Sequence, residues 1–63
     1  MYKKINVYIN NNYVYSTKQF RTCKECKDDL TARAKRCEVV MVNSVNLIKY
    51  QLRPTDIIKC SYK

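Results

Sequence analysis

The sequence contains no histidine, no glycine and no tryptophan, and it has a single proline. With no histidine, no glycine and only five acidic residues, the chain has few of the residues from which active sites are assembled. No catalytic motif and no nucleic-acid-binding motif matches the sequence. We therefore expect a protein that is not an enzyme and that needs no cofactor.

Long apolar runs are also missing. The N-terminal stretch MYKKINVYINNN has no apolar core of the signal-peptide kind, and no run approaches the ~18 residues that a membrane span needs. These absences predict a cytoplasmic protein with no membrane contact, in a compartment where thiols stay reduced. The length of 63 residues predicts one small domain, 1–63, that buries only about 60% of its unfolded surface.

Acidic side chains are scarce relative to basic ones. The net charge is +8, and residues 1–21 carry four bases and no acid. Such a field favours a polyanionic partner, namely nucleic acid, an acidic protein surface or anionic lipid, although charge also keeps small domains soluble. Phe, Tyr, Met, Ile, Asn and Lys supply 29 of the 63 residues, and this AT-rich codon usage suggests a low-GC bacterium, a phage or a mobile element.

A helix is predicted over residues 22–36. Thr22 followed three positions later by Glu25 forms a capping-box pattern, in which the Thr22 hydroxyl accepts from the Glu25 amide and the carboxylate returns to the Thr22 amide. The apolar stripe along this helix recurs at helical spacing. Its members are Cys23, Cys26, Leu30 and Ala34.

A β-hairpin is predicted before the helix. Residues 2–9 alternate between Ile5, Val7 and Ile9 on one face and polar or aromatic side chains on the other. The asparagines at 10–12 tolerate positive φ and predict the turn. A two-residue turn at Asn11–Asn12 puts Tyr8 opposite Tyr15, with both Tyr13 and Tyr15 on the outer face, whereas a three-residue loop sends Tyr13 and Tyr15 to the core. A one-residue slip exchanges the two faces, and we favour the two-residue turn because it groups the aliphatic residues.

Three further strands are predicted after the helix, at 37–42, 47–52 and 57–62. The first is apolar on both faces, which is typical of a central strand or of one covered by a partner, so a homodimer is among the states considered. The order β-β-α-β-β-β predicts an α+β fold with two layers, in which one antiparallel sheet carries the helix across one face.

Four cysteines raise the question of zinc or redox chemistry. Cys23 and Cys26 form one CxxC pair, but Cys37 and Cys60 stand alone instead of forming a second pair. Both cysteines of the pair lie on the apolar stripe, where reduced thiols pack as small hydrophobic groups. We therefore predict core packing and no metal site, with zinc and a thioredoxin-like role as the alternatives.

The outer face of the hairpin carries the candidate binding site, because it interleaves aromatic rings with cations on a segment without acids. Rings that stack on bases and cations that contact phosphates are the combination that nucleic-acid binding uses. Two functions follow as hypotheses: a small basic nucleic-acid-binding accessory protein, or a phage or mobile-element protein that binds and modulates a host protein. The predicted site residues are Tyr2, Lys4, Tyr8, Tyr15, Lys18 and Arg21.

Overall fold

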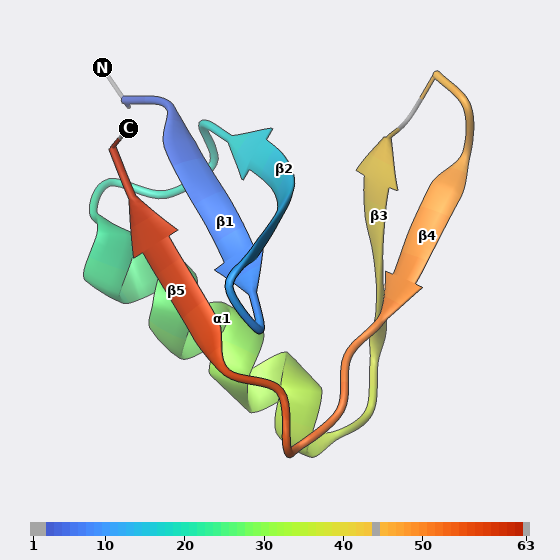
Figure 1. Cartoon of the computed structure of the whole chain (residues 1–63). Helices are drawn as coiled ribbons and strands as arrows, with labels where there is room; N and C mark the ends of the chain where they lie inside the picture. Colours follow the sequence, from blue (N-terminus) through green and yellow to red (C-terminus); the bar gives the residue numbers. More distant parts are fainter. Residues whose placement is uncertain (1–2, 44, 63) are drawn as a thin grey trace.

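The computed structural model describes residues 3–43 and 45–62 of the chain. Within these residues, strands and helix follow the predicted order β-β-α-β-β-β, and all strand pairs are antiparallel. The predicted α+β class is therefore confirmed (Figure 1). The elements are β1 (Ile5–Ile9), β2 (Asn12–Thr17), α1 (Cys23–Lys35), β3 (Val39–Asn43), β4 (Ile48–Gln51) and β5 (Ile58–Ser61).

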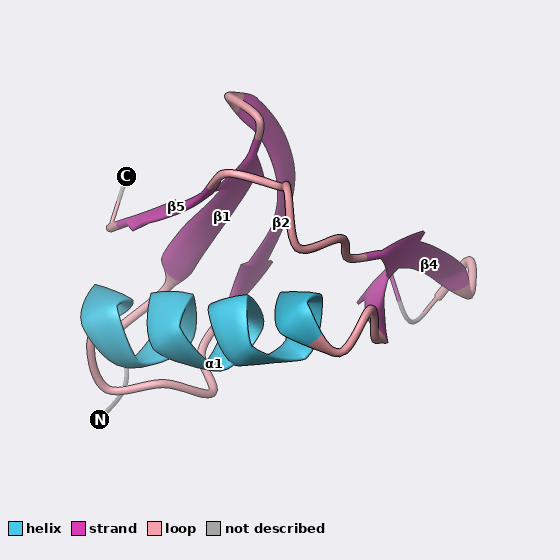
Figure 2. Ribbon diagram, turned by 90° about the horizontal axis from the view of Figure 1, so that it is seen from below, coloured by secondary structure: helices cyan, strands magenta, loops and turns pink. Residues whose placement is uncertain are grey.

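The strands form two sheets, not the single sheet that the sequence predicted. A three-stranded sheet has the order β2-β1-β5, and among the described residues β3 pairs only with β4. Figure 2 shows α1 beneath the three-stranded sheet and the β3–β4 hairpin off to one side. The prediction that β3 is a central strand is wrong: Val40 is buried, but Val39 and Met41 on the other face stay about half exposed. Apolar residues on both faces of the strand indicated that both faces are buried. In the described residues, however, the face with Val40 is buried and the face with Val39 and Met41 is not.

The helix begins as predicted. Thr22 is its N-cap, and the Thr22 hydroxyl accepts a hydrogen bond from the Glu25 amide at 3.2 Å. The Glu25 carboxylate, however, accepts from the amide of Arg21 at 3.3 Å instead of the predicted Thr22 amide. The apolar stripe is confirmed, because Cys26, Leu30 and Ala34 are buried and Cys23 packs beside them.

The helix ends without the glycine that usually follows a helix. Cys37 takes the left-handed conformation there with φ of 54°. Its amide donates to the Ala34 carbonyl at 3.0 Å and the Glu38 amide donates to the Arg33 carbonyl at 3.0 Å, which together make a Schellman motif. This turn directs the chain from α1 into β3.

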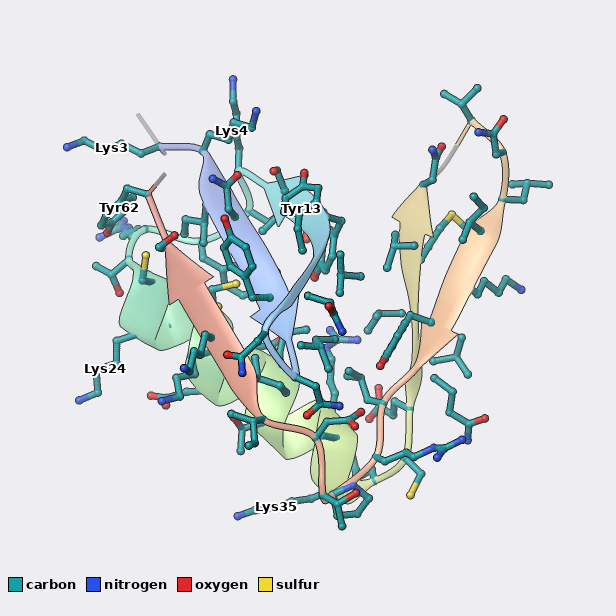
Figure 3. The ribbon with its side chains drawn as sticks, viewed as in Figure 1. Lys3, Lys4, Tyr13, Lys24, Lys35 and Tyr62 are labelled. Carbon is teal, nitrogen blue, oxygen red and sulfur yellow. The ribbon has the colours of Figure 1, made fainter. Side chains whose placement is uncertain are left out.

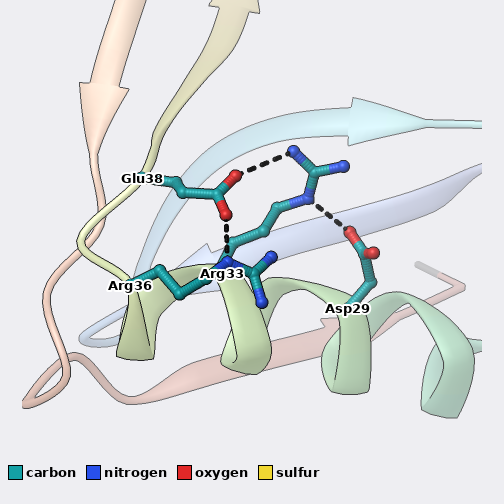
Figure 4. A network of polar contacts seen from close by, with 4 residues as sticks. All are labelled: Asp29, Arg33, Arg36 and Glu38. Atoms are coloured by element: carbon teal, nitrogen blue, oxygen red, sulfur yellow. Dashed lines mark hydrogen bonds and ion pairs between the residues drawn. The ribbon is translucent and has the colours of Figure 1, made fainter.

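Ion pairs tie the helix to the start of β3 (Figure 4). Arg33 contacts Asp29 one turn earlier at 2.8 Å and the Glu38 carboxylate at 3.5 Å. Arg36 donates to the other oxygen of Glu38. All four side chains are partly exposed, so each pair contributes at most about 1 kcal/mol.

The core lies between the three-stranded sheet and the helix, and it receives one side chain each from β3, β5 and the residue after β4. Ile5, Val7 and Ile9 of β1 supply its centre, as predicted from their alternation. Because the protein is small, this one cluster supplies most of the apolar burial. The buried residues are Ile5, Val7, Ile9, Cys26, Leu30, Ala34, Val40, Leu52 and Ile58.

The first hairpin has a two-residue turn, but one position earlier than predicted. Asn10 and Asn11 have φ of 53° and 69°, and Ile9 pairs with Asn12. Two successive positive φ angles make a type I′ turn, which matches the twist of the flanking strands. The Asn10 side chain fixes this position, because it accepts from the Ile57 amide at 3.0 Å and donates to Asp56 at 3.2 Å.

A β-bulge then changes the faces of β2. Tyr8 pairs with Tyr13 whereas Val7 pairs with Tyr15, so Val14 is the extra residue between the two pairs. A bulge inserts one residue into one strand and shifts the alternation beyond it. Consequently Tyr13 shares the outer face with Tyr8, while Tyr15 shares the inner face with Val7. The predicted outward position of Tyr15 is wrong for this reason, and neither turn considered from the sequence gives this arrangement.

Candidate nucleic-acid interface

The face of the three-stranded sheet opposite α1 carries polar and aromatic side chains from all three strands. Tyr8 of β1 alternates with the buried Val7 and Ile9, so it points away from the helix. Its partners across the sheet are Tyr13 on β2 and Lys59 on β5, and paired residues share a face. We call this surface the outer face, and it consists of Asn6, Tyr8, Tyr13, Ser16, Lys59 and Ser61.

Two tyrosine rings lie side by side on the outer face, next to the Asn10–Asn11 turn. The ring centroids of Tyr8 and Tyr13 are 5.8 Å apart with an interplanar angle of 69°, which is an edge-to-face contact. Tyr13 is 57% exposed, whereas Tyr8 is about half buried between its neighbours. Figure 3 shows Tyr13 in front of the sheet, on the side away from α1. A ring with this exposure is free to stack on a planar ligand such as a base.

A chain of hydrogen bonds holds the Tyr13 ring in place. The Ser16 hydroxyl donates to the Asn6 side-chain carbonyl at 2.7 Å. A serine hydroxyl has one proton, so its oxygen accepts from the Tyr13 hydroxyl, which lies 2.7 Å away. The chain orients the ring before any ligand binds, which lowers the entropy cost of binding.

Cations border the outer face. Lys59 lies next to Tyr8 and donates to the Asn11 side chain at the turn at 3.3 Å. Lys3 and Lys4 lie at the start of β1, at the opposite end of the sheet from this turn (Figure 3). The 18–22 segment, with the exposed Lys18 and Arg21, passes the same end (Figure 1). The aromatic pair is therefore bordered by positive charge at both ends of the sheet.

The structure brings together only part of the predicted site. Tyr8 lies on the outer face near the Asn10–Asn11 turn, whereas Lys4 lies at the opposite end of the sheet (Figure 3). The segment 18–22, which contains Lys18 and Arg21, passes that opposite end (Figure 1). Tyr2 lies outside the described residues. Tyr15 lies on the helix side and packs against the core.

The environment of Tyr15 agrees with its inward position. Burial raises the pKa of Tyr15 to about 12, and the nearby Cys26, Cys60 and Asp29 act in the same direction. A phenol in this environment is poorly hydrated and stays protonated at neutral pH. Tyr15 therefore supports the core and does not belong to the binding surface.

Tyr13 and Lys59 lie on the outer face but were not among the predicted site residues. The favoured register did put Tyr13 on this face, but it put Tyr15 there too; separating the two required the Asn10–Asn11 turn and the Val14 bulge, and the turn is fixed by Asn10 contacts to residues 46 and 47 positions away. Lys59 needed the pairing of β5 with β1. A local signal for Lys59 exists, because it alternates with the buried Ile58 and the half-buried Cys60.

The cysteines do not form an evident metal site. Among residues 3–43 and 45–62, no group of three or more cysteine, aspartate or glutamate side chains is placed to hold a metal ion. Burial raises the pKa of the Cys26 thiol to about 12, with the hydrogen bond to Cys60 adding to it, and burial also raises the pKa of Cys60. These thiols are therefore poor nucleophiles.

Compared with known proteins, the chain shows no significant similarity to a family model, to a curated protein or to a solved structure. In the part of the chain that the structure describes, no helix has the length and apolar character needed to cross a membrane.

Proposed function

We propose that this protein is a small, non-catalytic, cytoplasmic nucleic-acid-binding protein that holds single strands on its outer face. The observation that carries the proposal is the exposed, pre-oriented Tyr13 ring beside Tyr8, bordered by cations at both ends of the sheet. Bases stack on such rings regardless of sequence, and lysine and arginine contact phosphates. Binding should therefore follow backbone charge more than base sequence. An accessory role in a low-GC bacterium, a phage or a mobile element fits the composition.

Single strands fit this surface better than duplexes. The outer face belongs to a three-stranded sheet. It therefore presents an open surface of strands, and not a helix that would enter the groove of a nucleic-acid duplex. An unpaired base reaches an aromatic ring directly, whereas duplex bases are already stacked on each other.

Fluorescence anisotropy with a labelled single-stranded oligonucleotide tests the proposal. Tyr13→Ser should weaken binding by about 5- to 150-fold, which corresponds to about 1–3 kcal/mol for one stacked base. Tyr62→Ser is the matched control, because Tyr62 is 49% exposed but its hydroxyl accepts from the Cys23 amide at the start of α1, away from the outer face. Binding that is equally affected by both variants would contradict a stacking role for Tyr13.

The salt dependence supplies a second criterion. Lys59→Gln should reduce the slope of log affinity against log salt by about one phosphate contact. Lys35→Gln, in the last turn of α1 and away from the outer face (Figure 3), should leave the slope unchanged. A slope near zero for the wild-type protein would refute nucleic-acid binding by charge.

A protein partner is the second candidate, and the β3–β4 hairpin favours it. Val39 and Met41 of β3 are 51% and 48% exposed, and Val45 and Leu47 at the hairpin tip are 88% and 68% exposed. Exposed apolar groups of this size gather where proteins bind one another. In this case the protein binds and modulates a host protein, and capture from nuclease-treated lysate would recover that protein without nucleic acid.

A further inference from the structure

A groove of about 510 Å³ separates β2 from β3. It takes residues 15–17 from β2 and 39–42 from β3, and Asp29, Leu30 and Arg33 of α1 also line it. Consecutive residues of a strand point to opposite faces of its sheet. A groove lined by unbroken runs of two strands is therefore bounded by the edges of those strands and not by one face.

Both of these edges are unpaired within the described part of the chain. β2 is the outer strand of its sheet, and β3 pairs only with β4. In residues 3–43 and 45–62, no backbone hydrogen bond joins β2 to β3. An unpaired edge presents a row of N–H and C=O groups that readily bind another extended chain.

The direction of the strands indicates how such a chain would lie. Figure 1 shows β2 and β3 running the same way, and the groove lies between them. A segment running the opposite way between them would be antiparallel to both. It would join the two sheets into one antiparallel sheet of order β5-β1-β2-segment-β3-β4, in which both open edges are hydrogen-bonded.

The lining indicates the side chains of such a segment. Leu30 lies at the helix side of the groove with Tyr15 and Phe20 beside it, so alternate side chains of the segment would be apolar. Arg33 and Asp29, the charged residues of the lining, are paired with each other at 2.8 Å. They therefore add no net charge to the groove.

The surrounding charge selects an acidic segment. Two residues of the loop after β2, Gln19 and Phe20, also line the groove. The exposed Lys18 and Arg21 flank them in the sequence. The ion pairs of the described residues use only Arg33 and Arg36 among the basic side chains, so Lys18 and Arg21 have no carboxylate partner there. A second copy of this chain would also carry a charge of +8 and would be repelled.

We propose that this groove binds an extended, acidic segment of another protein, which adds as a strand between β2 and β3. Some Cα atoms of β2 and β3 lie within 8 Å of each other, whereas two strands with a third between them are about 9.6 Å apart. The β3–β4 hairpin must therefore move outward when the segment enters. The groove lies along the edge of β2 beside the outer face and shares Ser16 with it, but the proposal rests on the two unpaired edges and not on nucleic-acid binding.

A synthetic nine-residue peptide in which valine alternates with glutamate is a direct probe. We expect it to bind, and to shift the backbone amide signals of residues 15–17 and 39–42 in a ¹⁵N-labelled sample. The same peptide methylated at every second backbone nitrogen keeps its side chains but loses hydrogen bonds to one edge, so it should bind at least about tenfold more weakly. This comparison uses the wild-type protein and needs no variant to fold.

Matched charge variants complete the test. Lys18→Gln with Arg21→Gln should weaken peptide binding several-fold, whereas Lys24→Gln with Lys35→Gln on the helix should not. The proposal is overturned if millimolar peptide fails to bind, if methylation makes no difference, or if the shifts fall only on the outer face. It is also overturned if a single-stranded oligonucleotide displaces the peptide and shifts the same β2 and β3 amides, since the groove would then be a nucleic-acid site.

Discussion

Replacing Tyr15 with serine should destabilise the fold more than replacing Tyr13, although both tyrosines lie on β2 and are two positions apart. Tyr15 is half buried against the core. Removing a fully buried aromatic side chain costs about 3–5 kcal/mol, so a half-buried one should cost about 2 kcal/mol. Tyr13 is 57% exposed, and its edge-to-face contact with Tyr8 contributes about 1 kcal/mol at most.

Thermal unfolding followed by circular dichroism measures this difference. For a domain of this size, 1 kcal/mol shifts Tm by about 4–8 °C. Tyr15→Ser should therefore lower Tm by about 8–16 °C, and Tyr13→Ser by no more than about half as much. Equal losses, or a greater loss for Tyr13→Ser, would refute the bulge at Val14, because a regular strand places both rings on one face.

Further predictions concern the helix and the thiols. Leu30→Ala should cost about 2–5 kcal/mol in urea unfolding because it empties the core, and Thr22→Ala should cost about 1 kcal/mol through loss of the N-cap. An unchanged Leu30→Ala protein would refute the core assignment. The pKa of Cys26 is raised from 9.0 to about 12, so the folded state keeps a proton that the unfolded chain releases. Stability should then fall as pH rises from about 9 toward 12, by about 1–2 kcal/mol at pH 10, and Cys26→Ala should lessen the fall. Cys37, which is exposed, should react fastest with a thiol reagent, and Cys26 should react only after denaturation; rapid native labelling of Cys26 would contradict its burial.

The elements of the fold were predictable because their signals are local. The Thr22 cap and the stripe that includes Leu30 lie within 13 residues of each other, and helical spacing alone assigns them. Ile5 and Val7 show their buried face through a period of two. Such patterns require no knowledge of the rest of the chain.

The arrangement of the sheets was not predictable, because it depends on distant contacts. The first turn is placed by Asn10 bonding to Asp56 and Ile57, and three successive asparagines offer no local reason to prefer one position. The Val14 bulge has no glycine or other marker in the sequence. The same gap explains the candidate site: Tyr8 was predicted correctly, but without the bulge Tyr13 and Tyr15 were expected on the same face, and Tyr15 was chosen for the site.

The central claim is that the outer face binds single-stranded nucleic acid, and an amide-resolved NMR titration tests it most directly. A ¹⁵N-labelled sample is titrated at low salt with an unlabelled single-stranded oligonucleotide. We predict that the largest shifts fall on Asn6, Tyr8, Tyr13 and Lys59, with little change in the β3–β4 hairpin, and that added salt reverses them. Saturating oligonucleotide that shifts none of these four amides, or that shifts only α1 or the hairpin, would contradict the account.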